Sequence, residues 1–387
     1  MTIAVKRYYD GMNSNSPVLN GTAGSLISLL DAVLVNGFNS KTVTLSQTGG
    51  TATLSCSSHG FNVYDVISIS GANESAWNDE FRVLTTTTNT LTFAIGSNTT
   101  SPATGTITAK IAPLGWTKPF SGTNKAAYLP KSIYSQCYLR VQDDSSTPIS
   151  ANGRWAKIRG YETMSDIDTG TGLFPTVAQL TNSLSLMKSN ASDSTGRGWR
   201  IYGDGGIFYM FVFWLNSLIA DCNIFGDINS IKAGDAYGCV ITGTYQDTLP
   251  SGVGYSNNNG TIATNFIAQS GKYIARSYTQ IGSSSGFCCI GDYILGGSNT
   301  LMGISGLTFP NGANGGLLYG TLALIENSSL RSKQLPGFYY PFHNNPVSDF
   351  SIIDSVADLP GRALISQSIA STGTGGMCFF DIIGPWR

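Results

Sequence analysis

The chain has 387 residues, a formal net charge of −1, only 12% charged residues, 41% hydrophobic residues and 46 glycines. Such a composition is too apolar for a disordered protein, and it lacks the basic excess with which nucleic-acid-binding proteins neutralise phosphates. We therefore expect a folded protein with a surface of Ser, Thr, Asn and Gly and no nucleic-acid partner. The length predicts two or three domains.

Residues 1–40 are predicted to form an N-terminal strand, near residues 3–9, and one amphipathic helix over residues 22–35. The helix is indicated by a stripe of apolar residues at helical spacing, namely Leu26, Leu29, Leu30, Val33 and Leu34. Thr22 is the candidate N-cap and Gly37 the candidate terminator. The stripe is expected to pack on a sheet. The N-terminus lacks the apolar core of a signal peptide.

Residues 41–113 are predicted to form a small β sandwich or barrel. Its strands are expected at residues 52–56, 65–70, 80–84, 90–95 and 105–111, where apolar and polar side chains alternate. A chain reversal is expected at His59-Gly60-Phe61, because glycine reaches backbone angles closed to other residues. Since a strand and a helix precede this module and strands follow it, the module is a candidate insertion into a larger domain.

Residues 114–387 are predicted to form a large antiparallel β domain, after a boundary at 113–124, where turn-forming residues argue against a regular element. Strands are expected at residues 138–141, 156–161, 199–202, 207–215, 219–225, 237–241, 273–278, 317–325, 363–369 and 377–383. Residues 207–215 are too few to cross a bilayer, which takes roughly 20, and are interpreted as a buried central strand, so no membrane insertion is expected. Residues 183–198 and 250–261 are predicted to be exposed loops. The predicted fold class is mainly β, a multi-domain antiparallel sandwich or barrel architecture with one N-terminal amphipathic helix.

The seven cysteines are dispersed, odd in number and without a CxxC pair; they are Cys56, Cys137, Cys222, Cys239, Cys288, Cys289 and Cys378. This pattern does not indicate a disulfide framework, and two histidines are too few to favour a zinc site. We expect reduced, mostly buried thiols and predict no metal-binding or cofactor-binding residues.

The candidate catalytic residues each have a simpler structural interpretation. His59 and His343 have no acid partner or nucleophile at a suggestive spacing. Glu162, Asp166 and Asp168 could supply the paired carboxylates of a glycan hydrolase, but their glycine-rich context favours turn and capping roles. The glycines of residues 203–206 lie between two strands and favour a hairpin turn over a phosphate-binding loop. We therefore predict no catalytic residue and no enzyme.

The module resembles a small β module that recurs in virion proteins of tailed bacteriophages. The resemblance rests on His59-Gly60-Phe61, Asp65, the alternating Val66, Ile67 and Ile69, Gly71, and the run from Trp77 to Val83. In that family a glycine usually precedes the aspartate, where this chain has Tyr64. The wider chain resembles phage and prophage virion structural proteins through residues 19–26, Asp31, 37–38, 115–124, 160–167, 170–172, 226–228, 232–236, 275–280 and 335–337.

The resemblance implies a structural component of a phage virion that assembles in the host cytoplasm. We expect it in the tail, at the tip, nozzle, baseplate or fibre attachment, as a homo-oligomer on a virion symmetry axis that also contacts other virion proteins. A capsid decoration protein and a tail-borne adhesin or depolymerase that contacts host glycans remain as alternatives, with the host cell surface as a further candidate partner. The aromatics Trp116, Phe120, Tyr339 and Tyr340 are expected to form surface contacts.

Overall fold

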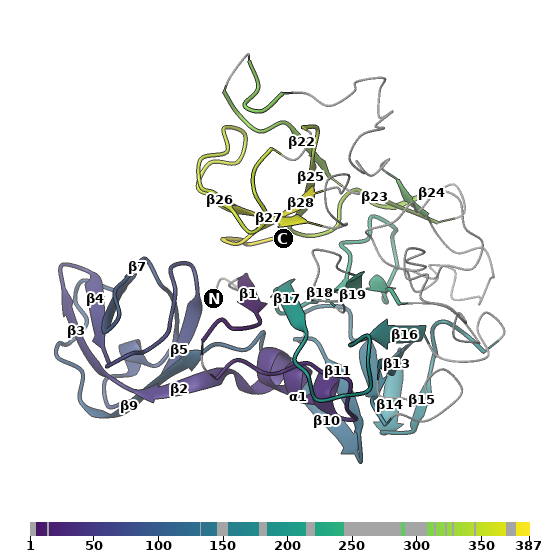
Figure 1. Cartoon of the computed structure of the whole chain (residues 1–387), viewed down its shortest axis with the longest axis horizontal. Coiled ribbons are helices and arrows are strands. Elements are labelled where there is room, and N and C mark those ends of the chain that lie inside the picture. The colour runs from purple at the N-terminus through teal and green to yellow at the C-terminus, as the bar shows by residue number, and fades with distance from the viewer. Residues whose placement is uncertain are drawn as a thin grey trace.

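The computed structural model describes residues 5–13, 15–131, 133–144, 154–177, 184–213, 221–243, 288–290, 308–312, 315–321, 323–326, 329–343, 346–368 and 377–387. These residues form antiparallel sheets with little helix, which confirms the predicted fold class (Figure 1). The predicted loop at 250–261 and the predicted strand at 273–278 lie outside the described residues. Within the described residues, none of the helices has the length and apolarity that a bilayer crossing needs.

Strands β2 to β9 form two four-stranded sheets, which Figure 1 shows in purple and blue. The first has the order β2 (Phe38–Thr42), β9 (Gly105–Ile111), β5 (Val66–Ala72) and β6 (Glu80–Arg82). The second has the order β3 (Thr44–Thr48), β4 (Thr51–Ser55), β8 (Thr90–Ala94) and β7 (Thr85–Thr86). A 3-10 turn, η2 (Ser75–Trp77), places the fully buried Trp77 between them. The alternation of apolar and polar residues predicts β4, β5, β6, β8 and β9, but it predicts no strand at β2, β3 or β7.

The other sheets are built mainly from residues after 113, and β1 joins one of them. The central sheet has the order β1 (Lys6–Tyr9), β17 (Gly198–Gly203), β18 (Ile207–Phe213), β19 (Asp221–Asp227) and β20 (Cys239–Ile241). The lower sheet has the order β10 (Thr117–Gly122), β11 (Lys125–Leu129), β12 (Tyr138–Gln142), β13 (Trp155–Tyr161) and β16 (Leu184–Met187). The C-terminal sheet has the order β22 (Tyr319–Thr321), β25 (Phe338–Pro341), β28 (Met377–Asp381), β27 (Leu364–Ser368) and β26 (Ile352–Ile353). Two smaller sheets comprise β14 (Thr163–Asp166) with β15 (Thr169–Thr171), and β21 (Cys288–Ile290), β23 (Ala323–Glu326) and β24 (Ser329–Ser332).

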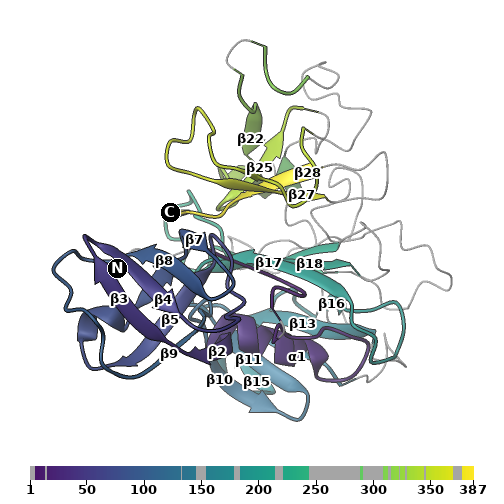
Figure 2. The ribbon, with the colours of Figure 1, turned by 60° about the vertical axis from the view of Figure 1, so that its left-hand side comes forward.

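The central sheet is covered on both faces, as both ribbon views show (Figure 2). In β18 all seven residues are buried. Phe208, Met210 and Val212 join the core shared with the lower sheet and the module. The alternate residues, with Tyr209 and Phe211 among them, join the core under the C-terminal sheet. A strand with two buried faces explains the unbroken apolar run, and it confirms the prediction of a buried central strand.

The helical segment is shorter and less regular than predicted. It consists of α1 (Ser25–Leu30) and a π-helical stretch, η1 (Asp31–Asn36), which ends at Gly37 as expected, where φ is +71°. Its apolar stripe is buried as predicted. The prediction of Thr22 as N-cap is wrong, because Gly24 occupies that position without a side-chain hydrogen bond.

Two predicted irregular segments contain strands. Residues 117–122 form β10, an edge strand whose register shifts between Thr117 and Phe120 and therefore accommodates Pro119. Residues 184–187 form β16, which pairs with β13 and is buried, so the prediction of an exposed loop at 183–198 is wrong in this part. The strand is only four residues long, includes Ser185 and has polar flanks, so its sequence does not indicate a buried strand.

Arg82 joins the module to both ends of the described chain. Its guanidinium donates to the carbonyl oxygens of Val5, Tyr64, Ile382 and Ile383 over 2.7 to 3.1 Å. Burial lowers the pKa of Arg82 to about 10. Because a planar guanidinium offers five donors in fixed directions, one side chain can satisfy carbonyls from three separate segments. The module is thereby fixed to β1 and to the segment after β28.

Candidate interaction surface

The sheet β3-β4-β8-β7 presents an outward face composed almost entirely of hydroxyl side chains. Its inward residues, Leu45, Ala52, Leu54, Leu91 and Phe93, are buried. The strand register places ten residues on the opposite face, and nine are Ser or Thr: Thr44, Ser46, Thr48, Thr51, Thr53, Ser55, Thr85, Thr90 and Thr92, with Ala94 as the tenth. We call this set the hydroxyl face. None of these ten residues is buried or charged.

The hydroxyl groups of this face lie close enough to bond one another. Thr85 Oγ1 and Thr92 Oγ1 are 2.6 Å apart across the β7–β8 pair. Thr53 lies directly opposite Ser46 on one side and Thr92 on the other, so the face has a continuous central row. The outward side of the other sheet differs, because Ser68 there lies opposite both Lys110 and Glu80. The absence of charge is thus specific to one side of the module.

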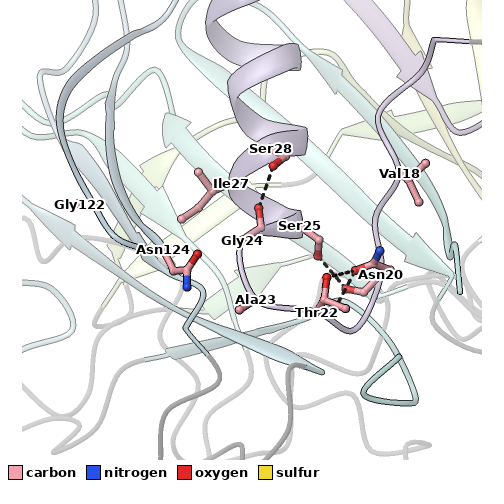
Figure 3. A pocket seen from close by; sticks show the side chains of 10 residues that line it. All are labelled: Val18, Asn20, Thr22, Ala23, Gly24, Ser25, Ile27, Ser28, Gly122 and Asn124. Atoms are coloured by element: carbon pink, nitrogen blue, oxygen red, sulfur yellow. Dashed lines mark hydrogen bonds between the residues drawn. The ribbon is translucent and has the colours of Figure 1, made fainter. Parts of the chain in front are cut away.

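A second feature is an open hollow of about 500 Å³ at the start of α1, between residues 18–28 and the turn at 122–124 (Figure 3). Its polar groups are used within the turn: Asn20 Oδ1 accepts hydrogen bonds from the backbone and hydroxyl groups of Thr22, at 3.0 and 2.7 Å. Ser28 Oγ donates to the carbonyl oxygen of Gly24 at 3.1 Å. Part of segment 19–26, one of the segments that carry the family resemblance, therefore has a structural role: its polar groups stabilise the turn that lines this hollow.

Beneath this hollow, a buried ion pair supplies the cap that Thr22 does not. Asp143 Oδ2 accepts from the backbone N–H of Leu26 at 2.9 Å, and Asp143 pairs with Lys188. Lys188 Nζ also donates to the carbonyl oxygen of Thr22 at 2.6 Å, and both charged side chains are fully buried. Burial raises the pKa of Asp143 and lowers the pKa of Lys188. The two charges stabilise each other in place of water.

The two histidines are buried and have structural partners. His59 stacks on Phe61 at 5.5 Å, and its Nδ1 accepts from the backbone N–H of Phe61 at 3.0 Å. In His343, Nε2 accepts from the backbone N–H of Leu318 at 2.8 Å, and Nδ1 lies 3.1 Å from the carbonyl oxygen of Thr308. Both ring nitrogens of His343 therefore have backbone partners. These contacts support the structural interpretation of both histidines.

The acidic group lies around the β14–β15 hairpin. Asp166 Oδ1 accepts from the backbone N–H of Asp168 at 3.1 Å, the turn role that the sequence predicts. Asp168 pairs with Lys125 and with Arg140, and hydrogen bonds from these cations lower its pKa. Glu162 has its side chain packed over Gly172, where an added Cβ would lie 2.3 Å from the carboxyl carbon. A carboxylate paired with two cations is poorly suited to act as a general acid.

The glycine-rich turn at 203–206 joins β17 to β18, as predicted. Asp204 Oδ1 accepts from the backbone N–H groups of Gly206 and Ile207, at 2.7 and 2.9 Å, and Arg387 pairs with the same carboxylate at 3.2 Å. Within the described ranges, no group of three or more His, Cys, Asp or Glu residues could hold a metal ion.

The aromatic residues expected on the surface are partly in the core. Trp116 is 2% exposed, donates from Nε1 to the carbonyl oxygen of Asp204 and packs on Phe208. Tyr340 is also buried. Both expectations are therefore wrong, whereas Phe120 and Tyr339 are half-buried. The sequence alone does not indicate the hydroxyl face, because each of its strands shows only the usual alternation of apolar and polar residues. The pairing of the strands shows that their polar sides lie on the same face of the sheet.

Comparison with known proteins gives little further information. No protein-family model matches the sequence. No curated protein matches it. Among solved structures, the chain is similar to "Phage phi92 endosialidase" with 11% identity and a TM-score of 0.17. The alignment covers 89% of this chain and 52% of the other, so the chain spans about half the length of that protein. A TM-score of 0.17 is too low to indicate a shared fold, and the likeness supports no inference about activity.

Proposed function

We propose that this chain is a structural component of a tailed-phage virion, located in the tail, and that it acts by assembly with copies of itself and with other virion proteins. The observation that carries the proposal is the β2–β9 module. Its sequence has the phage-type pattern from His59 to Val83, and one whole side of it is the hydroxyl face.

The chemistry of the hydroxyl face suits contact between proteins. A Ser or Thr hydroxyl both donates and accepts, so a face of hydroxyls is complementary to an identical face. Uncharged groups also cost less to remove from water than Lys or Glu, which natural sheets use to oppose association. A self-complementary face fits an isologous, two-fold contact between two copies of the chain.

The attachment of the module suits the same role. Arg82 holds Val5, Tyr64 and the 382–383 segment. On the same side, Lys6 Nζ bonds Glu80 at 2.8 Å, and the Tyr8 hydroxyl donates to the carbonyl oxygen of Ala112 at 2.7 Å. A module fixed in this way presents the hydroxyl face in one direction relative to the central sheet, which favours a defined assembly geometry.

The test combines particle composition with solution mass. We expect antibodies against the purified chain to detect it in intact virions of a phage that encodes it, and multi-angle light scattering to give an oligomer. A copy number equal to one ring or a few trimers supports the tail, whereas hundreds of copies would place the chain on the capsid. A stable monomer that is absent from virions and cleaves a bacterial glycan would contradict the proposal and favour the depolymerase alternative.

A further inference from the structure

Two free cysteines from different sheets meet in the core. Cys137 directly precedes β12 of the lower sheet, and Cys239 begins β20 of the central sheet. Their side chains are 0% and 1% exposed and belong to one buried core, and the neighbouring Cys137 side chain adds to burial in raising the pKa of Cys239. Two further contacts place them together: the backbone N–H of Ser135 approaches Asp227 Oδ2 at 3.4 Å, and Asp227 lies directly opposite Cys239 in the β19–β20 register.

We propose that Cys137 and Cys239 are a cross-linking site, at which a disulfide joins the two sheets once the folded chain meets an oxidising medium. The oxidant is a small disulfide such as oxidised glutathione. One cysteine thiolate attacks it, releases one glutathione thiolate and forms a mixed disulfide; the neighbouring thiolate then displaces the second glutathione. Two protein thiols are thereby oxidised, and one glutathione disulfide is reduced to two thiols.

Three observations favour this pair over the other described thiols. The two side chains are neighbours in one buried core, so a mixed disulfide formed on one cysteine can be resolved by the other. The bond would close a loop of roughly 100 residues, a length at which a cross-link strongly restricts the unfolded chain. Cys56, in contrast, is half-buried, and its thiol donates to the carbonyl oxygen of the adjacent Ser57. Because burial raises the pKa of Cys239, the reaction should be slow and depend on local opening.

The experiment incubates the purified full chain with oxidised glutathione, both in buffer and in urea below the unfolding transition, which promotes local opening. Alkylation and intact-mass analysis should show the loss of two thiols and about 2 Da, and unreduced digests should yield one peptide pair linking Cys137 to Cys239. The Tm should rise by more than about 5 °C.

Variant chains separate this cross-link from general oxidation. Cys137→Ser and Cys239→Ser should each abolish both the linked peptides and the rise in Tm, whereas Cys56→Ser should keep both. The proposal is overturned if both thiols remain free after oxidation under both conditions. It is equally overturned if the linked peptides join other cysteines, or if the cross-linked chain melts no higher than the reduced chain.

Discussion

Tyr64 adopts a backbone conformation that usually belongs to glycine. Its φ is +69°, in the left-handed region that favours glycine, and the residue lies within a turn. Two hydrogen bonds keep Tyr64 in this conformation. Its N–H donates to the carbonyl oxygen of Val83 at 2.9 Å, and its carbonyl oxygen accepts from Arg82 at 3.1 Å. The chain therefore keeps this turn with a residue other than glycine at the positive φ.

This strain gives a prediction that compares two substitutions. Both Tyr64→Ala and Tyr64→Gly remove the ring, but only glycine relieves the positive φ, which costs a residue with a Cβ about 1 kcal/mol. We expect Tyr64→Gly to be more stable than Tyr64→Ala by about 1 kcal/mol in urea unfolding. At a backbone position with negative φ, an alanine variant is more stable than a glycine variant. If Tyr64→Ala were more stable than Tyr64→Gly, the positive φ would not be a source of strain.

Asp65, the next residue, carries a carboxyl group in a site that disfavours its charge. Burial raises the pKa of Asp65 to about 7, against the opposing effects of Arg7, 3.7 Å away, Asn62, whose backbone N–H donates at 2.7 Å, and Arg82. The folded state therefore binds this proton more tightly than the unfolded state, whose aspartate has its ordinary pKa near 4. The stability that the protonated group contributes is complete below pH 4 and is lost as the pH rises through about 7.

We therefore expect the free energy of unfolding to fall between pH 5 and pH 8 more steeply in the native chain than in Asp65→Asn, which cannot ionise. The difference over this window should approach, and not exceed, about 3 kcal/mol, because about two pH units lie between pH 5 and the folded pKa of about 7. Urea titrations at several pH values would measure it. Asp79→Asn, at an exposed position of the same module, is the matched control and should follow the native chain. Equal slopes for the native chain and Asp65→Asn would show that Asp65 does not titrate in this range.

Among the elements, α1 depends on residues far away in the sequence. Its first turn is bonded to Asp143, which lies 117 positions from Leu26 and is paired with Lys188. Removing one member of a buried ion pair typically costs 3–5 kcal/mol, because the other charge is left without a partner.

We expect Lys188→Met to destabilise the chain by about 3–5 kcal/mol, and the double variant with Asp143→Asn to recover part of that loss. The asparagine is neutral and can still accept from the N–H of Leu26. The control is Lys125→Met, which breaks the exposed pair with Asp168 and should cost less than about 1 kcal/mol. A double variant no more stable than Lys188→Met would show that the isolated charge is not the cause.

This contrast also shows what the sequence could and could not predict. Periodicity located β4, β5, β8, β9 and β18, because each strand's apolar pattern is contained within the strand itself. The cap of α1 depends on a contact between distant segments, and β16 is a four-residue run whose burial depends on its pairing with β13. For the site, the local contexts of His59 and Asp166 fit their observed contacts. The partners of His343 and Asp168 lie in distant segments of the chain. The hydroxyl face required the register of four strands, which no local pattern specifies.

For the whole molecule, the hydroxyl face predicts how assembly should respond to charge. Thr53→Lys and Thr92→Lys place cations in the centre of the face, where an identical copy would bring like charges together. We expect either variant to shift the mass measured by light scattering from oligomer to monomer and to increase the apparent dissociation constant at least about 10-fold, equivalent to about 1.4 kcal/mol.

The matched control is Thr108→Lys, on the outward side of the opposite sheet, where a hydroxyl pair with Ser70 has a charged neighbour in Lys110. It should leave the oligomer intact. Circular dichroism should be unchanged in all three variants, because each position is at least partly exposed. If Thr108→Lys disrupted the oligomer and Thr53→Lys did not, the contact would lie on the other side of the module.

The pairing of β1 with β17 also has a consequence for the order in which the molecule can form during synthesis. All strands of the module lie between residues 38 and 111, so they can pair once that stretch has left the ribosome. Lys6 to Tyr9 lie opposite Arg200 to Gly203, so β1 has no partner until more than half of the chain has been made. β1 is therefore placed only after the module that follows it, and until then its unpaired edge is open to mispairing with other nascent chains.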